Sequence, residues 1–303
     1  MNDIAFTVSY EIRSPKRGSL LKDAIISLTP LLSFCPTFIS IANHQPEEKY
    51  LKGAKGELRK VIADKYPATY FFAIALQRAT GVEVVPYLLC NELEPDLIDD
   101  LLLGFQYSEI KRVMALRGDR ISNTVKFPNR YTHSSELIRH IIDFNNFYCT
   151  KFKIGVAGYP DIHPTAISSE HDLFFLKSKT SLGASFVTTQ MFLDNQRFYD
   201  FLTRCSGQDI SATIYPGLKL IVDSSNLIQY KKRFNLEIPK ELELLFLNIQ
   251  KNDCNIIGEQ WLFHQCDDLI KNGQGHLHFY IFSDEDINGV FTVLKKLKEQ
   301  YPR

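Results

Sequence analysis

The sequence predicts an α/β protein, a (β/α)8 TIM barrel with extra helices between its seventh and eighth strands. Eight short runs rich in β-branched and aromatic residues recur along the chain, with segments of helical length between them. The runs are mostly continuous in hydrophobicity, as strands of a parallel sheet covered by helices tend to be. The 303 residues suffice for a barrel of roughly 250 residues plus additional helices. We therefore expect one domain over residues 1–303, although length alone leaves two domains open.

The eight runs define the expected strands in chain order. They occupy 6–12, 37–43, 83–90, 112–118, 153–159, 185–191, 211–218 and 275–282. Apolar residues spaced three and four apart predict helices over 21–32, 70–80, 97–105 and 136–144. The stretch 219–274 is long enough for two or three helices, and Pro239 suits the first turn of one. Ser283, followed by three acidic residues, predicts a cap and an acidic first turn for the last helix.

The composition favours a small-molecule partner. Thirty-five Lys and Arg residues balance 35 Asp and Glu residues, so no charge excess points to nucleic acid or to an anionic membrane surface. The chain lacks a signal-like start and any apolar run near the ~18 residues that span a bilayer, so we expect a cytoplasmic protein. Six scattered cysteines without a C-x-x-C pair indicate thiols in a reducing compartment.

Polar residues follow most of the expected strands. In a (β/α)8 barrel the chemistry lies on the loops after the carboxyl ends of the strands, so these residues should converge on one rim. A polar turn alone explains Arg117, Gly118 and Asp119 in "VMALRGDRIS", but the barrel turns Asp119 toward a site. The residues at or just after strand ends are Glu11, Asn43, His44, Cys90, Asn91, Glu92, Arg117, Asp119, Tyr159, Asp161, His163, Gln190, Tyr215 and Lys219.

Each of these residues also has a plain structural interpretation. Glu11 suits solvent or a helix cap, His163 can anchor a loop before Pro164, and Gln190 can satisfy backbone groups. Cys90 suits a small buried apolar position. The pair His276 and His278 shares one strand face, but no third ligand is evident and we predict no metal site. Neither a G-x-G-x-x-G nor a P-loop motif occurs.

Several strand ends carry motifs in a fixed order. The segments "SYEIRSPK", "ALRGD" and "VAGYPDIHP" precede "DLFFLKSKTSLGASFVTTQMFLD", which runs without a gap over 172–194. They resemble F-E-F-x-P-P-K, L-R-G-D, A-x-Y-P-E-x-H-P and D-L-x-x-L-K-x-K-x-x-A-G-A-x-x-x-x-T-Q-x-F-x-D of the methylenetetrahydrofolate reductase family. The later "IYPGLKLI" and "LHFYIFS" resemble its P-G-I-x-P-I and F-H-F-Y-T-L-N. The similarity extends, in order, over nearly the whole chain.

This resemblance implies a flavin-dependent reduction of 5,10-methylenetetrahydrofolate to 5-methyltetrahydrofolate. NADH or NADPH would reduce bound FAD, with FMN as the alternative flavin, and the folate would then replace the nucleotide. By position, Glu11 resembles the general acid that assists opening of the imidazolidine ring. Asp119 resembles an aspartate near flavin and pterin, and its charge would also favour a protonated Glu11. Gln190 matches a glutamine that hydrogen-bonds the pterin.

The resemblance also marks flavin-binding positions, some of them altered. Those that match are Arg117, Gly118, Asp119, Tyr159, His163, Asp172 and Lys179. Tyr87 replaces a flavin-facing histidine, and Ser134 opens a segment that corresponds to the family's A-S-D-L-V. Ala42, Asn43 and His44 replace a T-x-G ending that supplies a hydroxyl to the flavin.

Two alternatives stay open at this point. A related flavin barrel could act on another reduced pterin or one-carbon adduct. A non-catalytic paralogue could bind folate or serve as a partner subunit, and a homo-oligomer is equally open. The joint presence of Glu11, Asp119 and Gln190 favours the enzyme, because a binding module has less need of a poised acid.

Overall fold

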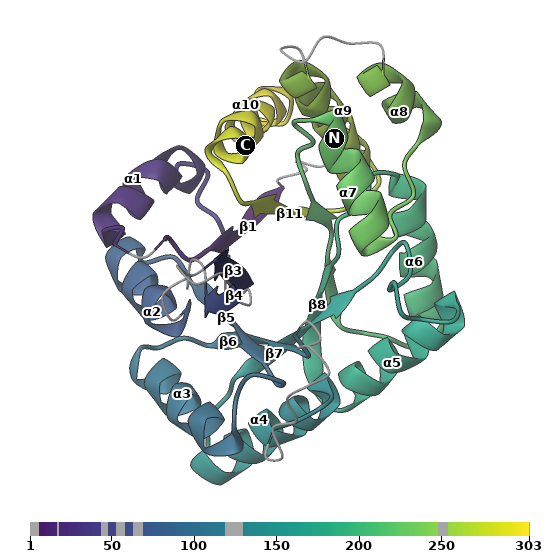
Figure 1. The fold of residues 1–303 in the computed structure, drawn as a ribbon. Helices are drawn as coiled ribbons and strands as arrows, with labels where there is room; N and C mark the ends of the chain where they lie inside the picture. Colours follow the sequence, from purple (N-terminus) through teal and green to yellow (C-terminus); the bar gives the residue numbers. More distant parts are fainter. Residues whose placement is uncertain are drawn as a thin grey trace.

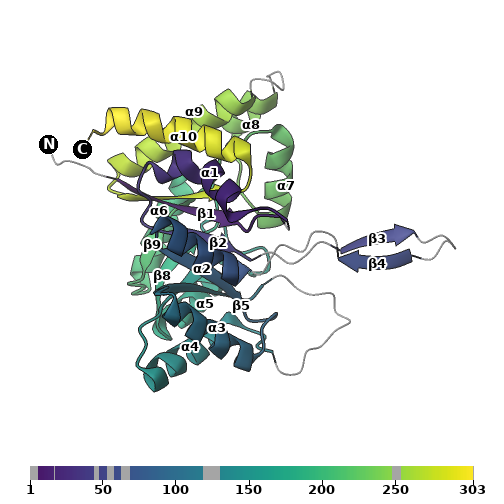
Figure 2. The same ribbon diagram turned by 90° about the vertical axis from the view of Figure 1, so that its left-hand side faces the viewer.

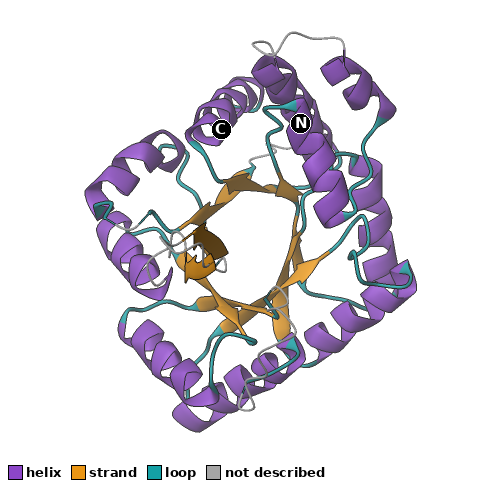
Figure 3. Ribbon diagram, viewed as in Figure 1, coloured by secondary structure: helices purple, strands orange, loops and turns teal. Residues whose placement is uncertain are grey.

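A computed structural model describes residues 6–16, 18–43, 48–52, 58–62, 69–118, 130–247 and 254–302. Figures 1 and 3 show a ring of strands surrounded by helices, which confirms the predicted TIM barrel. All neighbouring strands of the ring are parallel, in the order β10-β11-β1-β2-β5-β6-β7-β8-β9. The strands are β1 (Thr7–Arg13), β2 (Ile39–Ala42), β5 (Val84–Leu89), β6 (Arg112–Leu116), β7 (Lys153–Gly158), β8 (Ala184–Thr189), β9 (Thr213–Tyr215), β10 (Gly217–Leu218) and β11 (His276–Ile281).

The seventh barrel strand differs from the expected continuous run over 211–218. It is divided at Pro216 into β9, which pairs with β8, and β10, which pairs with β11. Proline has no N–H to donate to a ladder, so the pairing changes partner at this residue. The Pro216 carbonyl still accepts a hydrogen bond from His278 N at 3.1 Å. The divided seventh strand therefore links β8 to β11, and β11 in turn pairs with β1.

The helices lie where the apolar spacing predicts them, with small changes at their ends. Ser283 caps α10, its hydroxyl accepting from Asp286 N at 3.2 Å, as predicted. Among its described residues, the stretch predicted to hold two or three helices, between the seventh and eighth barrel strands, forms three. Within the described ranges, no helix combines the length and apolarity needed to cross a membrane. The helices are α1 (Leu21–Leu32), α2 (Thr69–Thr80), α3 (Pro95–Tyr107), α4 (Ser134–Tyr148), α5 (Ser169–Ser181), α6 (Asn195–Gly207), α7 (Ser224–Phe234), α8 (Lys240–Leu247), α9 (Cys254–Lys271) and α10 (Asp284–Gln300).

A β-hairpin between β2 and α2 was not predicted. Its antiparallel strands, β3 (Glu48–Lys52) and β4 (Leu58–Ile62), pair with Glu48 opposite Ile62. Figure 2 shows the hairpin standing well out from the barrel, on the side where the strands of the ring end. The strands read EKYLK and LRKVI, mixing charged and apolar residues without strict alternation over only five positions each, a weak signal beside the long runs of the barrel.

Apolar side chains fill the inside of the barrel as well as its outer layer. One buried cluster includes Phe38, just before β2, with Val85, Met114 and Phe186 from strands β5, β6 and β8. Gly155 on β7 leaves room for them, because a Cβ there would lie 2.2 Å from the Phe186 ring and 2.4 Å from Met114 Sδ. A larger cluster packs the outer faces of the strands against the helices. The interior is thus a packed core with a few polar groups in it.

We predict that Gly155→Ala lowers the free energy of unfolding by about 1–3 kcal/mol, because the added methyl overpacks the barrel interior. Urea unfolding followed by circular dichroism measures this change. The matched control is Gly104→Ala in α3, where an added Cβ meets nothing within 4 Å. That change should stabilise the protein by about 0.5–1 kcal/mol, since alanine is the better helix former. Equal effects at both sites would contradict the packing described here.

Candidate active site

Glu11 lies at the mouth of the barrel with its side chain inside. It is only 5% exposed, and by register it neighbours Tyr280 on β11 and Ser40 on β2. Because side chains alternate along a strand, Ser9, Glu11 and Arg13 share the inner face of β1. The sequence therefore places the predicted acid where a ligand at the mouth would meet it.

Tyr87 on β5 is the direct partner of this carboxyl. Its hydroxyl donates a hydrogen bond to Glu11 Oε2, across the width of β2. Burial raises the pKa of Glu11 to about 7, while the Tyr87 hydrogen bond and the charge of Arg13 act in the opposite direction. Burial is therefore the cause that raises the pKa of Glu11. The sequence also suggested the charge of Asp119 as a cause, but Asp119 lies outside the described residues. A carboxyl with a pKa near neutrality suits general acid catalysis.

Tyr280 and Thr189 fix the neighbouring part of the mouth. The Tyr280 hydroxyl donates to the Thr189 carbonyl at 2.6 Å, and Thr189 Oγ1 accepts from Gly217 N at 2.8 Å. A Cβ on Gly217 would lie 2.1 Å from the Thr189 carbonyl oxygen, so only glycine fits this crossing. These contacts hold β8, the divided seventh strand and β11 together, just before Gln190 leaves β8.

Gln190 is half-buried at the end of β8. Its backbone N–H donates to the Gly158 carbonyl at 2.8 Å, and its side-chain Oε1 accepts from Met191 N at 2.9 Å. The plain interpretation, that this side chain satisfies a backbone group, is thus correct for its carbonyl oxygen. The amide nitrogen adds two donors, which suit the acceptors of a pterin edge. Contact with a pterin stays a prediction.

The turn after β6 brings backbone groups of two strand ends together. Asn91, just beyond β5, donates from its backbone N to the Arg117 carbonyl at 3.2 Å. Gly118 has φ +86°, and a Cβ on it would lie 2.2 Å from Asn91 Oδ1. Glycine is therefore required both by the backbone conformation and by the close approach.

A second group of predicted cofactor residues gathers between the end of β7 and α5. The rings of Tyr159 and His163 meet edge to face at 4.6 Å, and His163 N donates to Asp172 Oδ2 at 3.0 Å. Lys179 Nζ donates to the Ala157 carbonyl at 3.3 Å. Burial lowers the pKa of Lys179 to about 8, opposed by the charge of Asp172. Burial lowers the pKa of His163, and the charges of Arg117 and Lys179 lower it further. Both cations therefore lie close enough to His163 to interact with it electrostatically.

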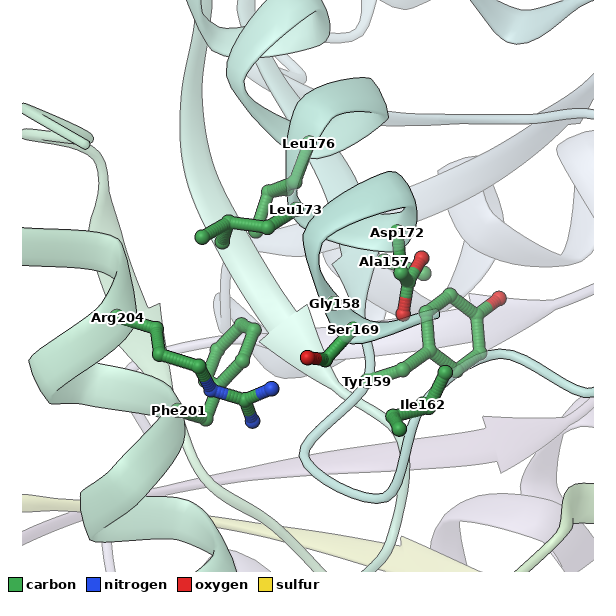
Figure 4. Close-up of a pocket in the computed structure, with 10 residues that line it drawn as sticks. All are labelled: Ala157, Gly158, Tyr159, Ile162, Ser169, Asp172, Leu173, Leu176, Phe201 and Arg204. Carbon is green, nitrogen blue, oxygen red and sulfur yellow. The ribbon is translucent and has the colours of Figure 1, made fainter. Parts of the chain in front are cut away.

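The chemistry of this second group fits a phosphorylated cofactor. Lys179 is a desolvated ammonium, and Arg117 and His163 add further donors of the kind that bind phosphate oxygens. Figure 4 shows the pocket beside this group, between α5 and α6. Arg204 from α6 lines it together with Tyr159 and Asp172. Arg204 Nη2 donates to the Pro160 carbonyl at 3.4 Å. The pocket is lined by Ala157, Gly158, Tyr159, Ile162, Ser169, Asp172, Leu173, Leu176, Phe201 and Arg204.

The other predicted strand-end residues take varied roles. Ser134 is the half-buried first residue of α4. Cys90 is buried, and its Sγ contacts the Arg117 carbonyl at 3.6 Å, as its plain interpretation predicts. Lys219 is buried in an ion pair with Asp286, a partner that the sequence did not indicate. Asp161 is buried, and its Oδ1 lies 3.9 Å from Arg197 Nε. His44 lies outside the described residues.

Two contacts at the mouth, the Tyr87–Glu11 and Tyr280–Thr189 hydrogen bonds, were not predicted from the sequence. Tyr87 was expected only as a flavin contact, and Tyr280 was not singled out. The period-two spacing of His276, His278 and Tyr280 places all three on the inner face of β11, and this signal was available for Tyr280.

The pKa of Glu11 predicts a pH dependence of stability. In the unfolded chain the carboxyl ionises at its ordinary acidic pKa, whereas the folded protein keeps the proton up to about pH 7. Ionisation therefore stabilises the unfolded state as the pH rises between these values, and the contribution of Glu11 lowers the free energy of unfolding by about 3 kcal/mol before levelling off. Urea unfolding across this range should show the free energy of unfolding of Glu11→Gln rising relative to that of the wild type, because Asp161, His276 and His278 titrate in both proteins and cancel in the difference. Parallel curves for variant and wild type would contradict it.

Comparison with known proteins identifies a family and relatives that match most of the chain. The family model described as methylenetetrahydrofolate reductase matches residues 1–298. A 5,10-methylenetetrahydrofolate reductase of Buchnera aphidicola subsp. Baizongia pistaciae is 30% identical over 227 residues, 74% of this chain and 74% of that protein. The protein of the same name from Escherichia coli K12 is 25% identical over 284 residues, 93% of this chain and 88% of the other.

A solved structure supports the fold independently. A Clostridium thermocellum protein, described as binding two copies of 5-methyl-5,6,7,8-tetrahydrofolic acid, has a TM-score of 0.64 to this chain. The alignment covers 99% of this chain and 97% of that chain at 13% identity, a level at which the likeness concerns the fold. The family model, by contrast, matches the chain over residues 1–298, and this chain therefore belongs to the methylenetetrahydrofolate reductase family.

Proposed function

We propose that this protein reduces 5,10-methylenetetrahydrofolate to 5-methyltetrahydrofolate, using NADH or NADPH and bound FAD. The observation that carries the proposal is the buried Glu11 carboxyl, which has a pKa of about 7 and lies at the barrel mouth against Tyr87. Opening the imidazolidine ring of the folate requires a proton donor that still holds its proton near neutral pH. Relatives that match 74% and 93% of this chain and are named as this reductase support the substrate.

The residues between β7 and α5 would hold the flavin. Lys179 and Arg117 would meet its phosphate oxygens, and Gly118 would let the backbone approach it closely. When bound, the flavin supplies hydride transfer from the nicotinamide nucleotide to the one-carbon unit of the folate. Tyr87 occupies a position where the family has a flavin-facing histidine, and here its hydroxyl is engaged by Glu11.

The protein's own contribution is to position the folate and to control one proton. Glu11 would donate its proton to the ring nitrogen that leaves the one-carbon unit, while the Tyr87 hydroxyl holds the carboxyl in place. Gln190 would hydrogen-bond the pterin edge through its amide nitrogen. Asp119 is proposed to favour positive charge on the folate, on the family resemblance alone.

Two other functions remain to be separated from this one by experiment. A purified protein that is yellow and bleaches anaerobically with NADH or NADPH supports an oxidoreductase. Reoxidation by methylenetetrahydrofolate then identifies the substrate, whereas reoxidation only by menadione indicates another pterin or one-carbon adduct. A colourless protein that does not take up FAD or FMN supports a non-catalytic folate-binding protein or partner subunit.

We predict that Glu11→Gln slows reoxidation of the reduced enzyme by methylenetetrahydrofolate about 100-fold or more, because the amide cannot donate the acid's proton. Reduction of the flavin by NADH or NADPH should be nearly unchanged, since that half-reaction does not use Glu11. Anaerobic stopped-flow absorbance measures both steps separately. Equal losses in the two half-reactions would count against the acid role.

Lys179→Met is expected to lower the flavin content of the purified protein, because it removes a desolvated cation from the proposed phosphate site. The matched control is Lys177→Met, two residues away on the same helix. Flavin content is measured from the visible absorbance per mole of protein. A Lys179 variant that retains flavin as well as the Lys177 variant does would rule out this role.

A further inference from the structure

Four polar side chains below the mouth form an unbroken hydrogen-bonded chain that the proposed reaction does not use. Register places Thr7 beside His276 and Ser9 beside His278 on neighbouring strands. Thr7 Oγ1 lies 2.7 Å from His276 Nδ1, and His276 Nε2 lies 2.7 Å from Ser9 Oγ. Ser9 Oγ is in turn 2.7 Å from His278 Nδ1. The chain runs from a half-exposed rim to the fully buried His278.

The surroundings of the two histidines disfavour a metal ion. Phe38 stacks on both rings, at 5.7 Å from His276 and 5.6 Å from His278. The Arg112 guanidinium lies 4.6 Å above Phe38 and places a positive charge nearby. Among the residues that the structure describes, no three His, Cys, Asp or Glu side chains gather as metal ligands. The histidines are therefore explained by the hydrogen bonds they make.

Both histidines are neutral near pH 7, since burial lowers the pKa of His276 to about 4 and that of His278 to about 3. A neutral imidazole has one donor and one acceptor nitrogen, and each hydroxyl donates once. The chain therefore has two ordered arrangements, which run in opposite directions. Moving each proton to its neighbour converts one into the other and carries one proton from end to end without an ionised imidazole.

The inner end of the chain approaches Glu11. His278 Nε2 is fully buried and, within the described part of the chain, makes no hydrogen bond, and the same holds for Thr188 Oγ1. The buried hydroxyl of Ser40, the strand neighbour of Glu11, also makes no hydrogen bond among the described residues, yet it lies close enough to the Tyr87 hydroxyl to lower its pKa against the larger effect of burial. Buried polar atoms without a protein partner are usually satisfied by an internal water.

We propose that Thr7, His276, Ser9 and His278, continued by one buried water, Ser40 and Tyr87, form a proton column that returns a proton to Glu11 from solvent at the opposite rim. The inference rests on the proposed function, because it needs Glu11 to lose its proton while ligands cover the mouth. As Glu11 is reprotonated, each group passes one proton inward and gains one from below, and Thr7 takes its proton from bulk water, whose hydroxide the solvent buffer neutralises. When the mouth is open, Glu11 exchanges with bulk solvent and the column shifts back.

Thr7→Val tests whether a change at the outer end of the column alters the protonation of the histidines further in. The change removes the outermost hydroxyl, three hydrogen bonds from the far nitrogen of His278. Nitrogen-15 NMR of histidine-labelled protein, which requires neither flavin nor substrate, should show altered tautomer populations at both His276 and His278. Thr7→Ser should restore them, and Thr213→Val, at the exposed start of β9, should leave them unchanged. An unaltered His278 in Thr7→Val would overturn the column whether or not the protein reduces folates.

Ser9→Ala tests whether the column serves Glu11. In single-turnover experiments the folate half-reaction should slow roughly tenfold or more, with a larger solvent isotope effect in D2O than in the wild type. Flavin reduction by NADH or NADPH should keep its rate. Ser14→Ala, a buried serine that bonds Thr69 at 3.3 Å outside the column, should leave the isotope effect unchanged. A Ser9 variant that slows both half-reactions equally, or neither, would overturn the proposal.

Discussion

The removal of one carboxyl group from water is the constraint on which the site depends. Glu11 is buried because β1 lies between β11 and β2, with the mouth closed around it by Tyr87 and Tyr280. In water this carboxyl would be ionised at neutral pH and would be useless as a proton donor. Above the ordinary pKa of glutamate, keeping the proton on the buried Glu11 carboxyl lowers the free energy of unfolding.

The charges around the mouth are arranged so that this acid is little disturbed. Lys219 is the buried cation of the divided seventh strand, and its charge is matched by Asp286, which also caps α10. Arg13 is the cation that lowers the pKa of Glu11, and its guanidinium lies over Phe282 at 4.5 Å. The cations proposed to hold phosphates gather instead between β7 and α5. An acid and an anion site can thus occupy one rim without neutralising each other.

Much of the fold follows from the sequence because the barrel strands are strongly apolar and well separated. The seventh strand was misjudged at Pro216, where the missing N–H divides the pairing but leaves the apolar run intact. The β3–β4 hairpin was missed because its strands are short and contribute no continuous apolar run. The site was predictable in outline, since strand ends of a barrel converge. The Tyr87–Glu11 contact was not, because it joins residues 76 positions apart across an intervening strand.

The central claim is that Glu11 is protonated at neutral pH, and infrared spectroscopy tests it most directly. The difference spectrum between wild type and Glu11→Gln isolates the carbonyl stretch of a protonated carboxyl. The account predicts that this band is present in mildly acidic buffer and disappears with a midpoint near pH 7. A band that is already absent above the ordinary pKa of a glutamate would contradict it.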